Sequence, residues 1–297
     1  MGRRCRPESY FDTIPHDRLI DQVAEEISDS SILRLIRAFL ESGVMEGGTF
    51  THSERGTPQG GVISPLLANI YLHAFNVRMT ERGHALIRFA DDWVILCRSQ
   101  SAAERVMEGA KRILEQELGL TMHPEKSRVV SAMEGFNFLG YTFWARPNNR
   151  EDGPRWYHGR RPSDKSLERC QDRLRELTRR NQTVSPEELA YRIRSYVRGW
   201  MAYFHKGKAK TRFGDMDMWL RRRFRMVVIR SWRSARKVHS ILIRRGWKRE
   251  KLIGFSPYRW RNSKCPMVHA ALDTQWLKSV GFVGLLDCYL KLSPARG

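Results

Sequence analysis

The sequence lacks three features that would assign it to a familiar class of protein. Its five cysteines are widely spaced and form no CxxC pair, so neither a disulfide framework nor a zinc site is indicated. No uninterrupted apolar run is long enough to span a membrane, and the first residues, MGRRCRPES, lack the apolar core of a signal peptide. We therefore expect reduced, structural cysteines and a cytoplasmic, bacterial protein.

Acidic residues are scarce in the second half of the chain. Residues 1–145 contain 16 Lys and Arg against 19 Asp and Glu, a net charge of −3, whereas residues 146–297 contain 37 against 13, a net charge of +24. Like charges at this density repel one another and are best tolerated beside a polyanion. Nucleic acid is the leading candidate and a membrane surface the lesser one, while a solvated basic face that binds nothing is the plain alternative.

The apolar pattern divides the chain into a mixed first half and a helical second half. At 297 residues and 41% hydrophobic, the chain can form about two domains with a sizeable core. Apolar spacings of three and four predict helices at 16–27, 30–42, 63–79, 101–119, 166–180, 185–207 and 216–237. Strand-forming runs occupy 85–90, 93–98, 127–132 and 136–145. Residues 146–164, rich in Pro, Gly, Asn and charge, are predicted to form a linker or exposed loop.

An aspartate pair, Asp91 and Asp92, stands between two of the predicted strands. The expected structure is a hairpin with both carboxylates at its tip, where their mutual repulsion is costly unless something neutralises it. Divalent cations would do so. Aspartates are also common in turns, so the dipeptide alone leaves an ordinary hairpin open.

The surrounding motifs resemble a known family. Five segments resemble, in order and separation, the successive palm motifs of a reverse transcriptase: SYFDTIPHDRLI (9–20), RGTPQGGVISPLLANIYLH (55–73), FADD (89–92), GLTMHPEKS (119–127) and FNFLGYTF (136–143). The segment RGWMAYF (198–204) and its basic sequel resemble the maturase domain of group II intron-encoded proteins.

This resemblance implies an α+β fold. Residues 1–145 would form a partial right-hand polymerase palm, residues 165–251 a mostly helical, basic thumb and maturase domain, and residues 252–297 a C-terminal segment whose structure is left open. The activity of the family is RNA-directed DNA polymerisation together with binding of intron RNA to assist splicing. The chain has no paired Cys or His cluster of the HNH type, which is similar to family forms without an endonuclease domain.

The resemblance also implies roles for individual residues. Asp91 and Asp92 would be catalytic and would hold two Mg²⁺ ions about 4 Å apart. Gln59 and Gly60 would line the incoming dNTP, and Phe11 would be the ring that excludes a ribose 2′-hydroxyl; the alternative for Phe11 is a core aromatic.

Another implied contact is that of Lys126 with the triphosphate, for which a solvated lysine after a turn is the alternative.

A third carboxylate, which a two-metal site needs, is missing from the sequence. In the family it is the leading Asp of a segment resembling DIxGYFD, but here that segment reads RPESYFD and places Arg6 there. Residues before Tyr10 do not resemble the family, and the fingers region is absent. We interpret the start as a replaced one, arising from a frameshift or a misassigned initiation site, and predict an incomplete metal site.

The basic half contains the candidate RNA contacts. The predicted RNA-binding side chains are Arg198, Lys206, Lys208, Lys210, Arg212, Arg221, Arg222 and Arg223. Trp200, Tyr203 and Phe204 are spaced at i, i+3 and i+4, which predicts that they lie mostly in a helical core.

Two hypotheses follow. The first is a fragment of a group II intron reverse transcriptase/maturase, with intron RNA, an RNA template, a DNA primer and dNTPs as partners, no membrane partner, and little or no polymerase activity of its own. The second is a non-catalytic RNA-binding maturase that acts as a splicing cofactor, or a decayed remnant.

Overall fold

Two compact units make up the chain. The computed structural model describes residues 2–4, 10–42, 44–46, 49–51, 55–57, 61–123, 127–150, 153–232, 235–252 and 265–293. Unit 1 comprises Met1–Leu139 and Phe143–His158, and unit 2 comprises Gly140–Thr142 and Gly159–Gly297. The mixture of helices and strands confirms the predicted fold class, and each unit has a hydrophobic core of its own.

Unit 1 contains short helices around a small core. They are α1 (Tyr10–Thr13), α2 (His16–Ala24), α3 (Ser30–Glu41), α4 (Ser64–Tyr71), α5 (His73–Glu81) and α6 (Gln100–Arg112), the last continued by a π-helical turn at Ile113–Glu117. Trp93, Tyr71 and Phe75 are its largest buried side chains. The single helix predicted for 63–79 is wrong in detail, because a break at Leu72 divides it into α4 and α5.

The strands of unit 1 are mostly short. They are β1 (Gly2–Arg4), β2 (Val44–Glu46), β3 (Thr49–Thr51), β4 (Ala85–Phe89), β5 (Asp92–Leu96), β6 (Arg128–Val130) and β7 (Phe136–Phe138). β4 and β5 form an antiparallel hairpin, as predicted. β1 pairs antiparallel with β6 and also contacts β5, so the first described residues lie beside the strand that starts at Asp92.

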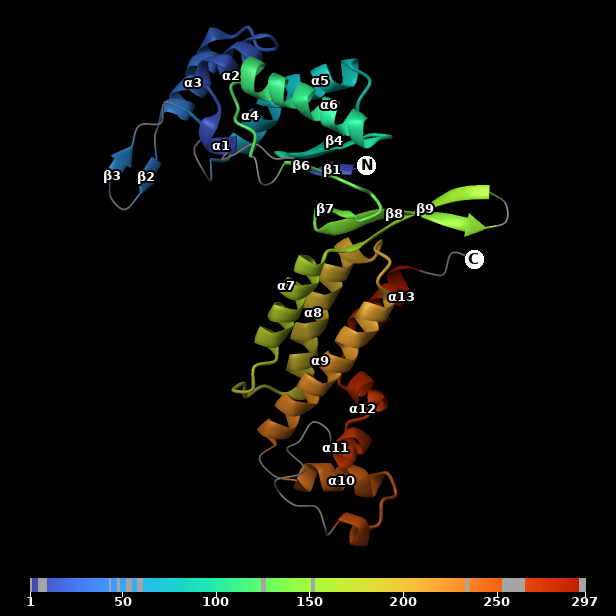
Figure 1. Ribbon diagram of the computed structural model, residues 1–297. Coiled ribbons are helices and arrows are strands. Elements are labelled where there is room, and N and C mark those ends of the chain that lie inside the picture. The colour runs from blue at the N-terminus through green and yellow to red at the C-terminus, as the bar shows by residue number, and fades with distance from the viewer. Residues whose placement is uncertain are drawn as a thin grey trace. The chain divides into compact units, whose positions relative to one another are not determined.

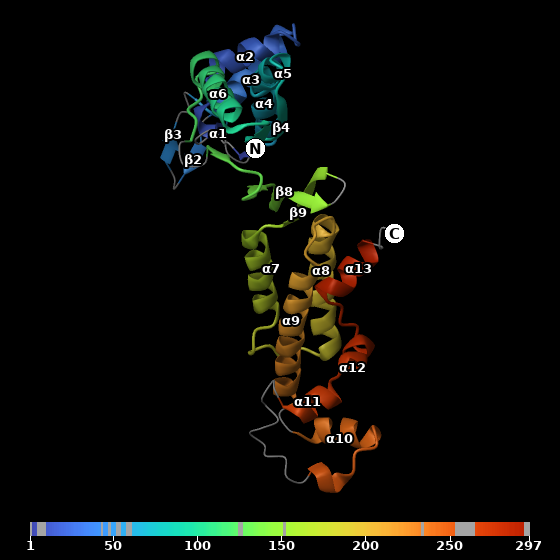
Figure 2. The same cartoon turned by 45° about the vertical axis from the view of Figure 1, so that its right-hand side comes forward.

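Two longer strands, β8 (Tyr141–Arg150) and β9 (Gly153–Pro162), complete a three-stranded sheet in the order β7-β8-β9. They form an extended ribbon in both views (Figures 1 and 2). The linker or loop predicted for 146–164 is therefore wrong. Charged and polar residues occupy both faces of these strands, so the sequence shows no apolar alternation that would reveal them.

Unit 2 is mainly helical. Its helices are α7 (Asp164–Leu177), α8 (Pro186–Phe204), α9 (Lys210–Ser231), α10 (Arg236–Arg244), α11 (Pro266–Ala271), α12 (Thr274–Ser279) and α13 (Leu285–Leu292), with a 3₁₀ turn at Arg249–Leu252. The long helices α7, α8 and α9 run side by side (Figures 1 and 2). None of the helices in the described ranges combines the length and the apolar character that crossing a membrane requires.

One buried carboxylate fixes α13 to α9. Asp217, in the middle of α9, accepts hydrogen bonds from the backbone N–H groups of Leu285 (2.7 Å) and Leu286 (3.1 Å). These are N–H groups of the first turn of α13, which have no partner within their own helix. Burial raises the pKa of Asp217 to about 6, against the opposing effect of these hydrogen bonds and of Arg221.

Candidate functional site

The aspartate pair lies at the hairpin turn, as predicted. Phe89 pairs with Asp92 across the hairpin, which leaves Ala90 and Asp91 as the connecting residues. Asp91 is only 7% exposed, whereas the ring of Phe89 is 63% exposed beside it. Ala90 has φ of 51°, in the left-handed region that alanine rarely adopts, and such a conformation costs on the order of 1 kcal/mol. The turn is therefore held in place by its surroundings.

Arg88 supplies that support. Its guanidinium donates to the carbonyl oxygen of Ala90 (2.8 Å), to Asn69 Oδ1 on α4 (2.9 Å) and to Asn76 Oδ1 on α5 (2.8 Å). Burial lowers the pKa of Arg88, while Tyr10 opposes that effect. One cation thus connects the turn that carries Asp91 to the two helices behind it.

The aromatic pair of α1 lies nearby in unit 1. Tyr10 is buried and donates its hydroxyl to the carbonyl oxygen of Ala68 on α4. Burial raises the pKa of Tyr10; the charge of Arg88 opposes this, and the charge of Asp91 adds to it. Phe11 is half-buried, with its ring centroid 5.5 Å from that of Tyr10, and it packs against the core of unit 1.

A glycine allows the next segment to approach α1 closely. Gly56 has φ of 88°, and a Cβ there would lie 2.6 Å from the carbonyl oxygen of Phe11. The backbone N–H of Thr57 donates to that same oxygen at 2.6 Å, and the carbonyl oxygen of Gly56 contacts His16 Nε2 at 2.6 Å. This brings the start of the predicted nucleotide-binding loop to Phe11, although Gln59 and Gly60 themselves lie outside the described residues.

The carboxylates in the described ranges do not make up a two-metal site. Asp91 and Asp92 are adjacent, but no group of three His, Cys, Asp or Glu side chains in these ranges could hold a metal. Two cations and a triphosphate require more ligands than one dipeptide provides. Arg6 and Lys126, which the sequence places at two further family positions, lie outside the described residues.

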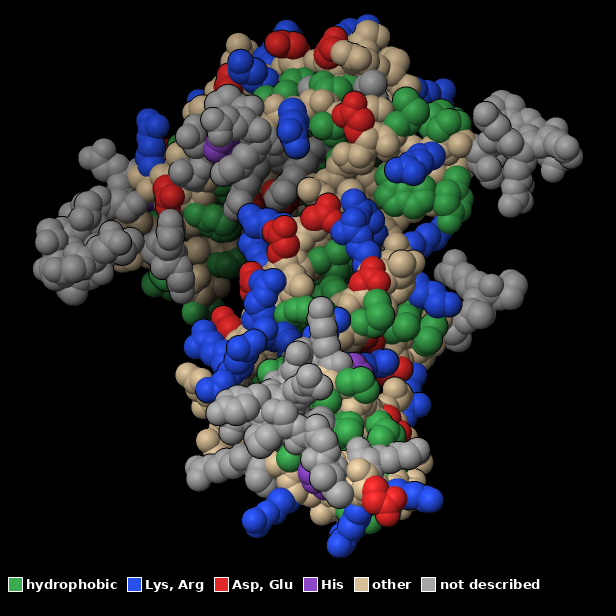
Figure 3. Space-filling view, turned by 60° about the horizontal axis from the view of Figure 1, so that its bottom comes forward, with side chains coloured by type: hydrophobic (Ala, Val, Ile, Leu, Met, Phe, Trp, Pro, Cys, Tyr) green, Lys and Arg blue, Asp and Glu red, His purple; other side chains and the backbone are tan. Residues whose placement is uncertain are grey.

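The predicted RNA-binding cations lie on or next to α8 and α9. Six of them are exposed and two are half-buried: exposed are Arg198, Lys206, Lys208, Lys210, Arg212 and Arg222, and half-buried are Arg221 and Arg223. The opposite sides of both helices supply buried core residues such as Val197 and Leu220. On the face shown in Figure 3, Lys and Arg side chains are prominent and acidic side chains are scattered among them.

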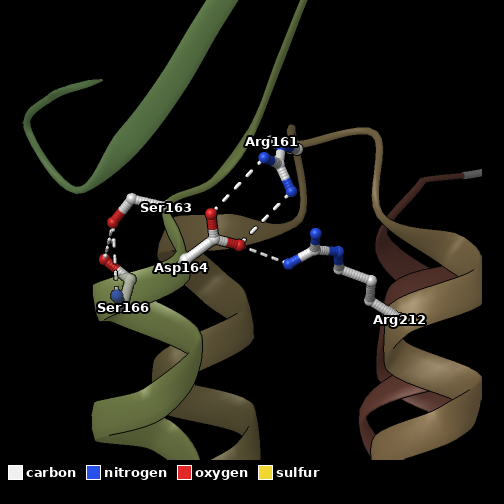
Figure 4. A network of polar contacts seen from close by, with 5 residues as sticks. All are labelled: Arg161, Ser163, Asp164, Ser166 and Arg212. Carbon is white, nitrogen blue, oxygen red and sulfur yellow. Dashed lines mark hydrogen bonds and ion pairs between the residues drawn. The ribbon is translucent and has the colours of Figure 1, made fainter. Parts of the chain in front are cut away.

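Arg212 and Arg223 are among these cations that have partners within the chain. Arg212 forms an ion pair with Asp164 at the start of α7, and Arg161 also contacts that carboxylate at 3.4 Å (Figure 4). Arg223 donates to Thr178 Oγ1 (2.7 Å) and to the carbonyl oxygen of Thr178 (3.1 Å), and so caps the C-terminal end of α7. These contacts connect α9 to both ends of α7, which is a role that charge counting does not predict.

The hydroxyls in Figure 4 fix the N-terminal end of α7. Ser163 Oγ accepts from the backbone N–H of Ser166 at 3.2 Å, and Ser166 Oγ donates to the carbonyl oxygen of Gly140 at 2.9 Å. Ser163 is therefore the N-cap of α7, and the cap is connected to the base of β8.

The aromatic prediction is partly confirmed. Phe204 is buried and stacks on Trp200, with ring centroids 4.3 Å apart. Tyr203 is 52% exposed, so its predicted core position is wrong. Its ring centroid lies 5.5 Å from that of Tyr141 and 4.8 Å from that of Phe204, and its backbone carbonyl accepts a hydrogen bond from the Tyr141 hydroxyl.

The sequence contained a signal for Arg88 that was missed. Arg88 interrupts the apolar run of β4 two residues before the turn, and a cation in a half-buried strand needs acceptors. Asn69 and Asn76, which supply them, occupy one face of an otherwise apolar helical segment, but their distance from Arg88 could not be read from the sequence.

Each of the two units contains a region that matches a known protein family. Residues 8–143 match the family model of reverse transcriptase (RNA-dependent DNA polymerase), and residues 167–253 match that of the group II intron maturase-specific domain. The chain belongs to the group II intron reverse transcriptase/maturase family.

Individual relatives are matched over part of their length. Protein YkfC of Escherichia coli is 30% identical over 167 residues, which are 45% of this chain and 44% of that protein. The group II intron-encoded protein LtrA of Lactococcus lactis is 48% identical over 63 residues, which are 21% of this chain and 10% of LtrA. A solved telomerase structure from Candida tropicalis aligns with 99% of this chain and 51% of its own, at 10% identity and a TM-score of 0.43, too low to establish a common fold. The chain thus spans less than half the length of these two relatives.

Proposed function

We propose that this group II intron reverse transcriptase/maturase chain binds intron RNA and assists its folding. The exposed cations on or next to α8 and α9 support this proposal, because they face solvent while the rest of each helix forms the core of unit 2. Lys206, Lys208 and Lys210 follow one another closely in the sequence, and the phosphates of an RNA would neutralise their charges. The net charge of +24 over residues 146–297 is of the right sign and size.

The test is RNA affinity as a function of salt. Binding of a labelled RNA stem-loop to the full chain should weaken steeply as salt is raised, because each phosphate contact releases counterions. Changing Lys206, Lys208 and Lys210 together to Gln should lower the steepness of log K against log salt by about 2. The matched control changes Arg105, Lys111 and Arg112, three exposed cations of α6 in unit 1, to Gln and should leave the slope nearly unchanged. Equal losses in both variants would contradict a site on α8 and α9.

A second candidate function is nucleotidyl transfer by the Asp91 and Asp92 turn. The hairpin geometry favours it. Asp91 lies in a two-residue turn that Arg88 stabilises, next to the exposed side chain of Phe89. Mg²⁺ would supply charge neutralisation for phosphoryl transfer, but the described carboxylates are too few for two ions. We therefore propose RNA binding as the activity of this chain and polymerisation as the family activity that it has largely lost.

A further inference from the structure

We propose that the ribbon formed by β8 and β9 is a binding site for unpaired RNA, with the Trp156 ring as its stacking surface. The ribbon lies largely between the two matched regions, which end at 143 and resume at 167, so neither family model assigns it a role. The proposal rests on the proposed RNA-binding function and extends it to a separate element.

The charge of the ribbon suits a polyanion. Residues 144–162 contain five arginines against two acidic residues, together with His158. Arg146 and His158 are exposed. A β-ribbon of this net charge is poorly suited to an apolar protein partner, whereas phosphates would neutralise it.

One face of the ribbon carries a cluster of rings with a cation. The ring centroids of Trp144 on β8 and Tyr157 on β9 are 5.3 Å apart at an interplanar angle of 55°. The guanidinium of Arg146 lies 5.7 Å from the centre of the Trp144 ring. Trp144 and Arg146 are two residues apart and so share a face of β8. This cluster stabilises the ribbon and keeps an exposed cation on it.

The opposite face presents Trp156. Successive side chains of a strand alternate, so Trp156 points away from the cluster that its neighbour Tyr157 joins. Trp156 is 60% exposed and Tyr157 is 48% exposed. A single exposed ring would need no explanation. His158, two residues further along β9, shares the face of Trp156 and is also exposed. An open indole on a narrow ribbon that carries an exposed cation, Arg146, on its other face can stack on an unpaired base, because every base has a face that can stack.

Unpaired RNA suits this surface better than duplex RNA. The deep, narrow major groove of A-form RNA excludes side chains, and bases inside a duplex already stack on one another. Loops and single strands leave bases free for Trp156. The phosphates on either side of the stacked base would then reach Arg146 around the edge of the narrow ribbon.

The experiment measures binding of the full chain to a labelled oligo(U) of about 15 nucleotides, a length within the range that such sites accommodate. Trp156→Ala should weaken binding about tenfold with the salt dependence unchanged, and Trp156→Phe should restore most of the affinity. Arg146→Gln should instead lower the salt slope by about 0.7, the value for one phosphate contact with a single strand. Leu35→Ala, which removes another exposed apolar side chain of unit 1, is the matched control and should have no effect.

Three outcomes would overturn the proposal. The first is an oligo(U) affinity of Trp156→Ala equal to that of a parent chain that binds RNA. A parent chain that shows no salt-dependent RNA binding at all would instead refute the proposed function. The second is an equal effect of Trp156→Ala on a fully paired RNA duplex, because stacking needs free bases. The third is a change of oligomeric state in Trp156→Ala by light scattering, which would show that the ribbon joins two copies of the chain. Thermal unfolding should be unaltered, since the Trp156 side chain is largely exposed.

Discussion

At the scale of single residues, Arg88 controls the turn that carries the aspartates. Arg88→Ala removes charge-assisted hydrogen bonds to Asn69, Asn76 and the carbonyl of Ala90, so the free energy of unfolding of unit 1 should fall by about 2 kcal/mol. Backbone amide exchange at Ala90 and Asp91 should also accelerate, because the left-handed turn loses its support. Hydrogen exchange followed by mass spectrometry measures this directly.

A matched variant tests whether the position or the charge matters. Arg98→Ala removes an exposed arginine just beyond the other end of β5 and should change neither stability nor exchange at the turn. Arg88→Lys keeps the charge but lacks the planar guanidinium that reaches three acceptors. Its stability and its exchange rate at the turn should therefore lie between those of the parent and of Arg88→Ala. Unchanged exchange at Ala90 in Arg88→Ala would show that the turn holds itself.

A second residue, Asp217, should make stability depend on pH. Burial raises its pKa in the folded protein to about 6, above the value of 3.8 expected for an ordinary carboxyl. Between these two pKa values the folded chain keeps a proton on Asp217 that the unfolded chain has released. The tighter proton binding stabilises the folded chain fully below pH 4, and this contribution is lost as the pH rises through 6. The free energy of unfolding should decrease by about 3 kcal/mol over that window. Asp217→Asn, neutral throughout, should lack this component when urea unfolding of both proteins is compared from pH 4 to pH 7; parallel curves would contradict it.

At the scale of elements, the docking of α13 on α9 depends on a glycine. A Cβ at Gly284 would lie 2.2 Å from Asp217 Oδ2, and that carboxylate cannot move away without releasing Leu285 and Leu286. Gly284→Ala should therefore lower the free energy of unfolding of unit 2 by about 2 kcal/mol. Gly199→Ala is the control: a Cβ there meets nothing within 4 Å on α8, so it should stabilise by about 0.5–1 kcal/mol. Denaturant unfolding measures both, and a stable Gly284→Ala variant would mean that α13 can shift.

Elements with one apolar face were predictable, and those without one were not. α2, α3, α7 and α8 start and end close to their predicted limits, because each buries an apolar stripe with a period near 3.6. The predicted strand at 136–145 covers β7 and the first half of β8. The second half of β8 and all of β9 escaped prediction, because their faces are polar or aromatic and their formation depends on pairing with each other. α9 begins at Lys210, six residues before the predicted helix, because its polar first turn carries no apolar period.

The candidate site was predictable to the same degree. The FADD motif located the hairpin and its carboxylates, since that pattern is local. The network around Arg88 joins residues 12 and 19 positions apart in sequence, and its geometry emerges only from how α4 and α5 pack on β4. The intrachain partners of Arg212 and Arg223 could not be predicted either, because they depend on how α7 and α9 pack together.

At the scale of the whole molecule, the two cores predict two unfolding transitions. The core of unit 1 draws on residues between Tyr10 and Met122, and that of unit 2 on residues between Leu167 and Cys288. Scanning calorimetry should therefore resolve two events, one shifted by several degrees in Arg88→Ala and the other in Gly284→Ala. A single transition that moves in both variants would show that the units unfold together.

Assays on the whole chain should also show RNA binding in the absence of polymerisation. Primer extension on poly(A)/oligo(dT) with Mg²⁺ should give little or no DNA, because the sequence has Arg6 where the family has its third carboxylate. Asp91→Asn should leave RNA affinity within about twofold of the parent, since it touches none of the proposed phosphate contacts. Normal synthesis by the parent chain, abolished in Asp91→Asn, would establish the second candidate function instead.

The strand β1 has a consequence for how such proteins change over evolutionary time. Gly2–Arg4 belongs to a stretch that does not resemble the family, yet it pairs with β6 and contacts β5. Backbone hydrogen bonds do not distinguish one side chain from another, so many tripeptides could occupy that place. A metal ligand has no such freedom. The sheet can therefore accept a changed segment at a place where a metal site could not, and an intact sheet is weak evidence for an intact metal site.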